Sequence, residues 1–320
     1  MQTRAIKANL PWQLVDFIDK NIPGAEICSL PNDLSKRKYY RIIFDKKNYV
    51  LMDSILEPNQ FNKYIRTTNF LEKANFSVPF IHLIDFENSI ALIEDFGDQK
   101  ANNLLMSVDL AGEKEVYKKS LYLIANLQKI NVDKELFPNH HKVILKDGID
   151  KFLDNCVLDF YKDKVENELN KLINDLSEPS IFSHRDFHVD NIMWLSEREG
   201  VKKVGLIDFQ DLSIGYQAYD VVSLLQDARR FITPFFEKQM IEFYFELIND
   251  IDREKFMHEY RILSIQRNLR IFGLFTNTTV EKESSNYTKY LPNVRNYIER
   301  EIHNLGLSEK TKTIILHSLS

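Results

Sequence analysis

The sequence predicts an α+β protein of two lobes, a small antiparallel-sheet lobe at the N-terminus and a larger, mostly helical lobe after it. Up to about residue 95, short runs of β-branched and aromatic residues alternate with polar turns, which is typical of paired strands. From about Asp109 onward, apolar residues recur at the spacing of long helices. A short linker-like stretch at about 94–100 separates the two patterns. We therefore expect an N-terminal lobe over 1–97 and a C-terminal lobe over 98–320, joined by a hinge.

The N-terminal lobe is predicted to hold two helices and five strands. Pro11 suits the first position of a helix that Gly24 ends. The polar residues Asp45 to Asn48 indicate a hairpin turn. A second hairpin turns at residues 85–88. The predicted helices cover 10–21 and 58–74, and the predicted strands cover 27–30, 39–44, 49–52, 80–84 and 89–93.

The C-terminal lobe is predicted to be helical with one β-like interruption. Helices are expected up to about 131, around 146–176, and over 234–249 and 253–275. The interruption runs over 181–209 and contains most of the polar residues that carry chemistry.

Composition excludes several classes of protein. The 320 residues hold 42 Lys and Arg against 47 Asp and Glu, a net charge of −5, so no positive field favours nucleic acid. The 9 glycines form neither the dinucleotide motif G-x-G-x-x-G nor the phosphate-loop motif G-x-x-x-x-G-K. The first twenty residues lack an apolar signal region and no apolar run reaches the length of a membrane span, so we expect a cytoplasmic protein without a membrane partner. Two distant cysteines, Cys28 and Cys156, indicate neither a disulfide framework nor a zinc cluster, and we expect both to be buried.

One constellation of polar residues points to chemistry. In S-H-R-D-F-H-V-D-N, Asp186 stands five residues before Asn191, and Asp208 ends the apolar run V-G-L-I-D. If residues 192–195 pair with 204–207 as antiparallel strands, Ile192 lies opposite Ile207 and Asn191 lies opposite Asp208. An amide oxygen beside a carboxylate suits Mg²⁺ that carries phosphate oxygens as its other ligands.

These three residues match the needs of phosphoryl transfer. The transition state of that reaction is loose, so a protein mainly positions groups and neutralises charge, while one carboxylate accepts the proton of the attacking hydroxyl. Asp186 would be that base, and Asn191 and Asp208 would hold the metal ion. The sequence therefore predicts a phosphotransferase.

The chain resembles the protein-kinase-like phosphotransferases, and within them the small-molecule branch of aminoglycoside phosphotransferases and choline kinases. It is most similar to the bacterial anomeric kinases of N-acetylmuramate and N-acetylglucosamine, which serve peptidoglycan recycling. The motifs that carry this resemblance are N-D-L-S-K-R-K-Y-Y-R (32–41), V-L-M-D (50–53), I-E-D-F-G-D (93–98), S-H-R-D-F-H-V-D-N-I-M-W-L (183–195), G-L-I-D-F-Q-D (205–211), A-Y-D-V-V-S-L-L-Q-D-A-R (218–229) and Q-R-N-L-R-I-F-G-L-F (266–275).

The resemblance implies a protein-kinase-like two-lobe fold and an ATP- and Mg²⁺-dependent kinase of a small sugar. It gives Asp186 the role of base and Asn191 and Asp208 the role of metal ligands. The backbone of Glu94 and Phe96 would hydrogen-bond adenine. A D-F-G tripeptide at 95–97 is a decoy, because the metal aspartate of this family follows the catalytic loop. No obligate protein partner is indicated.

The nucleotide site departs from the family pattern. Met52 occupies the position of the usual phosphate-binding lysine in the third strand, and no helix glutamate is evident. As a hypothesis, Arg41 or Arg37 supplies the positive charge, since a guanidinium can hold two phosphate oxygens. The alternative is that Lys36, Arg37 and Lys38 form a solvated hairpin tip.

Candidates for binding the sugar substrate follow or lie within the catalytic motif. They are His188, Asp211, Asp227, Arg229 and Asn268, with Arg267 as a further candidate. Arg267 and Arg270 are equally consistent with cations on a helix surface. His184 and His188 have the spacing of a zinc helix, but Arg185 replaces the required glutamate, so a metalloprotease is disfavoured. Asp220 resembles the aspartate that braces the catalytic loop and is expected to be structural.

Two other functions fit the same residues. One is an aminoglycoside or amino-alcohol kinase of the choline type, which would take a cationic acceptor. The other is a non-catalytic nucleotide-binding protein, which the methionine at position 52 suggests.

Overall fold

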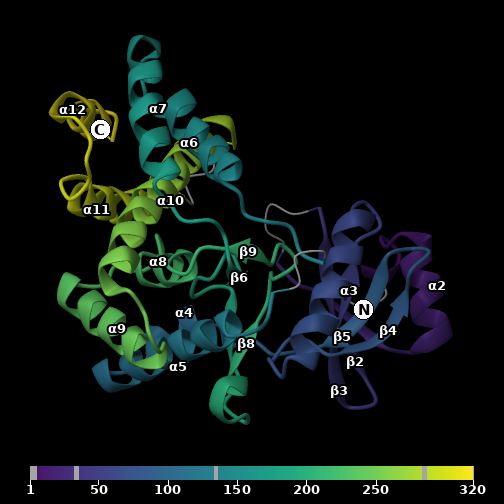
Figure 1. Cartoon of the computed structure of the whole chain (residues 1–320). Helices are drawn as coiled ribbons and strands as arrows, with labels where there is room; N and C mark the ends of the chain where they lie inside the picture. The colour runs from purple at the N-terminus through teal and green to yellow at the C-terminus, as the bar shows by residue number, and fades with distance from the viewer. Residues whose placement is uncertain (1–5, 32–35, 133–135, 283–286, 320) are drawn as a thin grey trace. The chain divides into compact units, whose positions relative to one another are not determined.

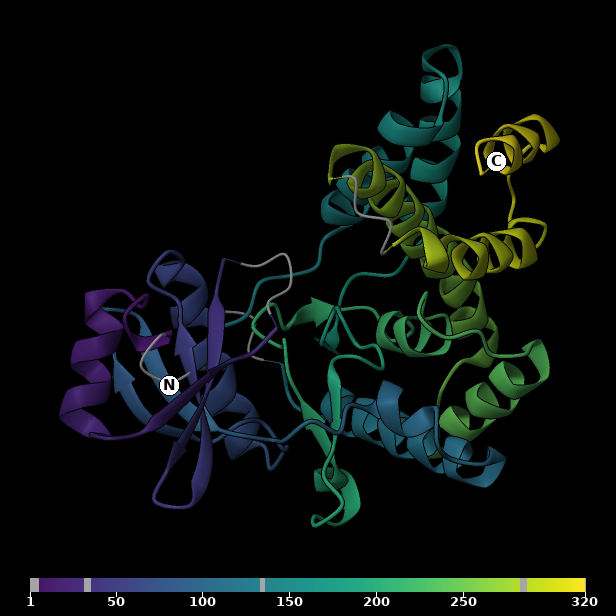
Figure 2. The same ribbon diagram turned by 180° about the vertical axis from the view of Figure 1, so that it is seen from behind.

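The computed structural model describes residues 6–31, 36–132, 136–282 and 287–319 (Figures 1 and 2). Residues 32–35 of the first family motif lie outside this part of the chain. The chain forms two compact units. The first runs to Leu104 and includes Asn191–Asp211, and the second contains Leu105–Asp190 and the chain from Leu212 onward.

The first unit is built on a five-stranded antiparallel sheet with the order β1-β2-β3-β5-β4 (Figure 1). Its strands are β1 (Glu26–Ser29), β2 (Lys38–Phe44), β3 (Lys47–Asp53), β4 (Ile81–Asp85) and β5 (Ile90–Glu94). All five expected strands are present. The turn between β2 and β3 contains only Asp45 and Lys46, both with positive φ (49° and 60°), which is the backbone of a two-residue hairpin loop.

Two helices accompany this sheet, α2 (Trp12–Asn21) and α3 (Pro58–Lys73). Pro11 is extended (ψ 144°) and precedes α2, so its predicted place as the first helical residue is wrong by one position. The apolar side of α2 packs on one face of the sheet, because strand residues that alternate along the chain share a face. That core consists of Leu14, Phe17, Ile18 and Ile22 against Ile27, Tyr40, Ile42, Leu51, Ile90 and Leu92.

A hairpin far along the chain also belongs to the first unit. It consists of β7 (Ile192–Trp194), a 3₁₀ turn (Gly200–Lys203) and β8 (Val204–Leu206). The Trp194 amide donates to the carbonyl of Gln99, and the Leu206 amide donates to that of Ser77. A short helix, α4 (Ala101–Leu105), follows the first of these contacts.

The predicted register of this hairpin is wrong by one residue. Ile192 lies opposite Leu206, not Ile207, and the Ile207 amide donates to the carbonyl of Asn191 at 3.2 Å. The cause is the 3₁₀ turn, which lets the Leu195 amide reach the Lys203 carbonyl and so displaces the pairing by one position. Asn191 therefore faces Ile207 in the ladder.

The second unit is mostly helical. The predicted helical stretch 146–176 is two helices, since the backbone is extended at Val157 and Leu158. One two-stranded sheet pairs β6 (Ile181–Ser183) with β9 (Ser213–Gly215). The helices are α5 (Leu110–Gln128), α6 (Lys142–Cys156), α7 (Asp159–Asn174), α8 (Tyr219–Leu225), α9 (Pro234–Leu247), α10 (Arg253–Lys282), α11 (Leu291–Ile302) and α12 (Glu309–His317), with a 3₁₀ turn at Thr288–Tyr290.

The expectation of buried cysteines is wrong. Cys28 lies on the exposed face of β1, and Cys156 at the end of α6 is half-buried. In the part of the chain that the structure describes, no helix is long and apolar enough to cross a membrane.

We predict that Gly273 of α10 is required for the close approach of α10 to α6, which lie side by side in both views (Figures 1 and 2). A Cβ at this position would lie 2.2 Å from the backbone oxygen of Lys151. Gly273→Ala is expected to lower the free energy of unfolding by about 1–3 kcal/mol, despite the better helix propensity of alanine. Denaturant titration measures the change.

Gly306→Ala is the matched control, because no atom lies within 4 Å of its Cβ position. This variant should stay within about 0.5 kcal/mol of the parent. Equal unfolding midpoints for the two variants would show that the approach of α10 to α6 is not tight.

Candidate active site

A buried aspartate holds the start of the segment that carries Asp186. We call residues 183–190 the Asp186 loop. Asp220, fully buried at the start of α8, accepts hydrogen bonds from the Ser183 hydroxyl (2.9 Å) and from the amides of His184 (2.7 Å) and Arg185 (3.0 Å). Arg185 has a φ of 76°, a conformation that costs energy for a residue with a side chain. The expected bracing role of Asp220 is confirmed.

The end of the same loop is held by a second buried aspartate. Asp227 accepts from the amide of Val189 (3.1 Å) and from the amide and guanidinium of Arg229 (3.0 and 3.3 Å). The Arg229 Nε lies 2.9 Å from a carboxylate oxygen of Asp190. Both ends of the Asp186 loop are thus tied to the stretch that follows β9.

Asp186 itself is half-exposed, with 54% of its side chain accessible. Its amide donates to Nδ1 of His184 (3.1 Å), so His184 is bonded to the backbone as expected, and its carboxylate lies 3.3 Å from Nε2 of His188. Reduced hydration acts to raise the pKa of Asp186, but His188, Arg267 and Arg229 together lower it far below its usual value. Asp186 is therefore an ionised carboxylate that a ligand can reach.

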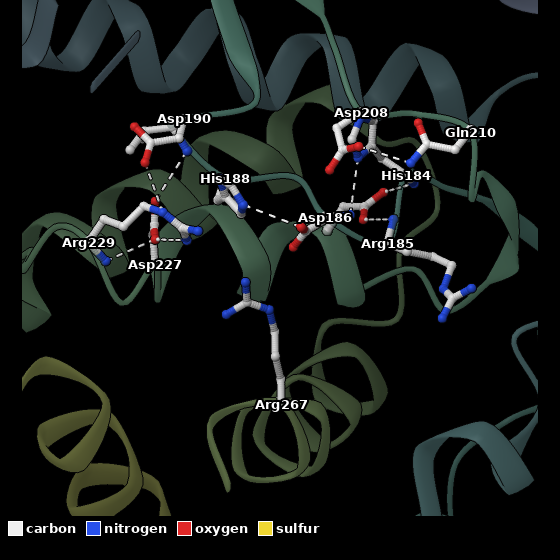
Figure 3. A network of polar contacts seen from close by, with 12 residues as sticks. His184, Arg185, Asp186, His188, Asp190, Asp208, Gln210, Asp227, Arg229 and Arg267 are labelled. Carbon is white, nitrogen blue, oxygen red and sulfur yellow. Dashed lines mark hydrogen bonds and ion pairs between the residues drawn. The ribbon is translucent and has the colours of Figure 1, made fainter. Parts of the chain in front are cut away.

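Two further candidates, Arg267 and Asn268, lie on α10, and Figure 3 draws Arg267 beneath the loop. Arg267 is only 3% exposed, so the alternative of a surface cation is wrong for it, whereas Arg270 is exposed. Asn268 is fully buried and donates to the side-chain oxygen of Gln226 at 2.8 Å. Arg267 donates to the backbone carbonyl of Gln226 at 3.4 Å, and its guanidinium points toward Asp186.

In the first unit, Asn191 and Asp208 lie at the same end of the β7–β8 hairpin. The ladder closes at the hydrogen bond between Ile207 and Asn191, and Asp208 follows with a positive φ of 59°. This left-handed residue breaks the alternation of the strand, so the register shift does not decide where the side chain points. The Asp208 carboxylate is 46% exposed and accepts from Nε2 of Gln210 at 2.9 Å.

Arg37 supplies a buried cation beside Asp208. Its side chain is 6% exposed, which rules out the solvated-tip alternative for Arg37 but not for its exposed neighbours Lys36 and Lys38. Its guanidinium lies 3.5 Å from Asp208 and 3.9 Å from Glu57, and it donates to the side-chain oxygen of Gln210 at 3.3 Å. Sequence reasoning missed Glu57, which stands immediately before α3 and belongs to no motif.

Arg41 is held elsewhere. It makes bidentate pairs with Asp95 (2.6 and 3.1 Å) and with Asp98 (3.1 and 2.8 Å), and these hydrogen bonds raise the pKa of Arg41 and lower that of Asp98. The structure thus places Asp95, the aspartate of the D-F-G decoy, against β2. Two carboxylates share one guanidinium, so Arg41 ties the 94–100 stretch to the sheet.

The remaining nucleotide-side candidates lie on or beside β5. Met52 is fully buried in β3, opposite Tyr39 and Ala91. Glu94 ends β5, and Arg198 donates to the Glu94 carboxylate at 2.5 Å. The guanidinium of Arg198 also lies over the ring of Phe96, 5.1 Å from its centre. Sequence reasoning missed Arg198. Asp211 is half-exposed and lies 3.9 Å from Nζ of Lys63.

Known proteins resemble this chain in sequence. Residues 26–257 match the model of the "Phosphotransferase enzyme family". The N-acetylmuramate/N-acetylglucosamine kinase of Pseudomonas aeruginosa is 25% identical over 298 residues, 88% of this chain and 85% of that protein. The protein of the same name from Caulobacter vibrioides is 32% identical over 123 residues, 38% of this chain and 34% of that protein.

Solved structures resemble this chain in fold. The ADP-bound aminoglycoside phosphotransferase APH(2'')-Ib superposes with a TM-score of 0.60 at 13% identity, covering 91% of this chain and 98% of its own. The choline kinase LicA from Streptococcus pneumoniae gives a TM-score of 0.61 at 12% identity, covering 91% and 97%. The predicted protein-kinase-like fold is confirmed.

We predict that the Asp186 loop depends on Asp220. Asp220→Ala leaves three donors without their acceptor in a buried site, so the free energy of unfolding should fall by about 3 kcal/mol. Turnover should fall at least about tenfold in protein that stays folded, because the loop loses its position. Denaturant titration and steady-state kinetics measure the two effects.

The control is Asp163→Ala on the exposed side of α7, which should change neither quantity. An Asp220→Ala variant as stable and as active as the control would remove the bracing role.

Proposed function

This chain belongs to the phosphotransferase enzyme family, and we propose that it transfers the γ-phosphoryl group of ATP to the anomeric hydroxyl of N-acetylmuramate or N-acetylglucosamine in the cytoplasm, as a step in peptidoglycan recycling. The observation that carries the proposal is the ionised, half-exposed Asp186 on a loop held at both ends by buried aspartates. The names of the kinases from Pseudomonas aeruginosa, Pseudomonas putida and Neisseria meningitidis support the choice of sugar.

In this proposal Asp186 is the general base. The acceptor hydroxyl donates a hydrogen bond to the carboxylate and loses its proton as its oxygen bonds to the transferred phosphorus, while the bond to the leaving ADP oxygen breaks. A low pKa suits a base whose task is to orient the hydroxyl and to take the proton late, once bond formation has acidified it. His188, 3.3 Å away, holds the carboxylate in place.

We propose that Asn191 and Asp208 hold Mg²⁺. Magnesium takes one or two protein oxygens and fills its other positions with water and substrate phosphates. Asp208 fits this need because its carboxylate is half-exposed and ionisable, and it leaves the strand beside Asn191 at the same hairpin end. Among the described residues no group of three or more His, Cys, Asp or Glu side chains could bind a metal, so the nucleotide phosphates would complete the coordination. The ion would neutralise charge on these phosphates.

Arg37 takes the place of the missing lysine in this proposal. A buried guanidinium beside Asp208 offers positive charge to phosphate oxygens, and Glu57 and Gln210 orient it. Arg41, the other candidate from the sequence, is held by hydrogen bonds of 2.6 to 3.1 Å to two carboxylates, whereas Arg37 lies 3.5 and 3.9 Å from its two. We propose that Arg41 acts indirectly by fixing the stretch whose backbone, at Glu94 and Phe96, would bind adenine next to buried Met52.

On the acceptor side, we propose that some candidates contact the substrate and others position those that do. The contacting residues would be His188, which lies beside Asp186, Arg229, which acts on Asp186 through its charge, and half-exposed Asp211. Asp227 and Asn268 are fully buried, so they would act by positioning Val189, Arg229 and Gln226.

The first test replaces the base. Asp186→Asn is expected to lower ADP release with Mg-ATP and N-acetylmuramate by at least about 10³-fold, since the amide cannot accept the proton. Binding of Mg-ATP, measured by calorimetry, should change less than about threefold, because the variant alters the acceptor side. Asp159→Asn, an exposed residue of α7, is the control for turnover.

Near-normal turnover by Asp186→Asn would overturn its assignment as the base. Choline and kanamycin belong in the same assay, since turnover confined to these cationic acceptors would replace the sugar by an amino alcohol or aminoglycoside. Binding of ATP without turnover of any acceptor would favour the non-catalytic alternative.

The second test concerns the phosphate-binding cation. Arg37→Met should raise the KM for Mg-ATP about tenfold, the equivalent of one charge-assisted hydrogen bond. Lys36→Met, its exposed neighbour, should leave this KM within about twofold. Equal KM values for the two variants would remove Arg37 from the nucleotide site.

A further inference from the structure

Arg267 is a buried cation without a described anionic partner. Its side chain is 3% exposed, and its hydrogen bond to the carbonyl of Gln226 is long, at 3.4 Å. Among the residues that the structure describes, no carboxylate lies within ion-pair distance of it, and Figure 3 shows its guanidinium pointing from α10 toward Asp186 and His188. Burying an unpaired charge is costly, so such a group in a folded protein calls for an anion.

The neighbouring carboxylates are paired with other groups. Asp190 and Asp227 lie 2.9 Å and 3.3 Å from the guanidinium of Arg229. Asp186 is engaged with His188 at 3.3 Å, and Arg267 acts on it only through its longer-range field. The guanidinium of Arg267 therefore faces the region of Asp186 with donors to spare.

We propose that Arg267 binds a carboxylate of the acceptor and so makes this enzyme prefer an acidic sugar. The inference rests on the proposed function, because it takes Asp186 as the group that receives the acceptor's proton. Asp186 and Arg267 belong to the same unit, and the guanidinium of Arg267 points toward Asp186, so a molecule whose hydroxyl meets Asp186 can present another of its groups to Arg267. The cation proposed for the nucleotide phosphates, Arg37, belongs to the other unit.

The two sugars of the proposed function differ in this very group. N-acetylmuramate is N-acetylglucosamine with a lactyl ether, which adds one carboxylate to an otherwise identical neutral ring. A planar guanidinium can hold a carboxylate through two parallel hydrogen bonds, which gives both affinity and orientation. A cationic acceptor such as choline would instead meet a like charge at Arg267.

The experiment crosses a change in the enzyme with a change in the substrate. kcat/KM is measured for N-acetylmuramate, its methyl ester and N-acetylglucosamine, with the parent enzyme and with Arg267→Gln. The parent is expected to prefer the free acid over the methyl ester by about tenfold or more, and Arg267→Gln should reduce this ratio to near one. Arg267→Lys should keep part of the preference, because it keeps the charge but loses the planar fork.

Arg270→Gln is the matched control, one turn further along α10 and exposed, and it should keep the parent ratio. The inference is wrong if the parent uses the acid and its ester equally well, or if Arg267→Gln lowers kcat/KM for all three sugars by the same factor. Both results leave the proposed function standing. Absence of turnover on every sugar by the parent enzyme is a different result, which overturns the proposed function itself.

Discussion

The position of the proposed catalytic loop depends on one buried carboxylate. Asp220 gathers three donors from consecutive residues, Ser183 to Arg185, and so stabilises a left-handed turn that a side-chain-bearing residue would otherwise avoid. Burial raises the pKa of Asp220, while the hydrogen bonds that it accepts from Ser183, His184 and Arg185 favour its ionised form. Because α8 is packed into the core of its unit, the position of Asp186 is inherited from the fold.

Charge in the second unit follows from this arrangement. Asp227, seven residues after Asp220, holds the other end of the Asp186 loop and also orients Arg229. Asp186 is left between cations, which keeps it ionised although it is crowded. In the first unit a cation is placed between carboxylates, since Arg37 lies 3.5 Å from Asp208 and 3.9 Å from Glu57. In the proposed site a methionine at position 52 is compatible with catalysis, because Arg37, immediately before β2, would replace the lysine.

Much of the fold follows from the sequence alone. All five strands of the sheet and both accompanying helices have strong local patterns, and Asp45 and Lys46 lie in a turn of the expected kind. The hairpin register was missed by one residue because a 3₁₀ turn lies inside its connection, and no alternation of residues reveals that turn. Cys28 was expected in the core but lies on the exposed face of an edge strand, and the apolar character of cysteine does not reveal which face of a strand it occupies.

The sequence motifs predict which residues the candidate site contains but not the partners that hold its arginines. The bracing role of Asp220 is confirmed, and the motif residues around Asp186 and Asp208 remain the proposed chemical groups. The partners of three arginines could not be predicted, because no regular spacing in the sequence links each arginine to its partner, and the two meet only in the folded chain. The pairs are Arg37 with Glu57, Arg41 with Asp98 and Arg267 with Gln226. The hairpin within 191–211 also belongs to the first unit, and its long-range backbone hydrogen bonds to Gln99 and Ser77 could not be predicted either.

The central claim is that this chain phosphorylates the anomeric hydroxyl of an N-acetylated amino sugar. The most direct measurement is phosphorus NMR of the product made from N-acetylmuramate and Mg-ATP by the parent enzyme. We predict one new phosphomonoester signal, coupled to the anomeric proton and equal in amount to the ADP formed. A signal coupled to the C6 protons, or inorganic phosphate as the sole product, would contradict the claim.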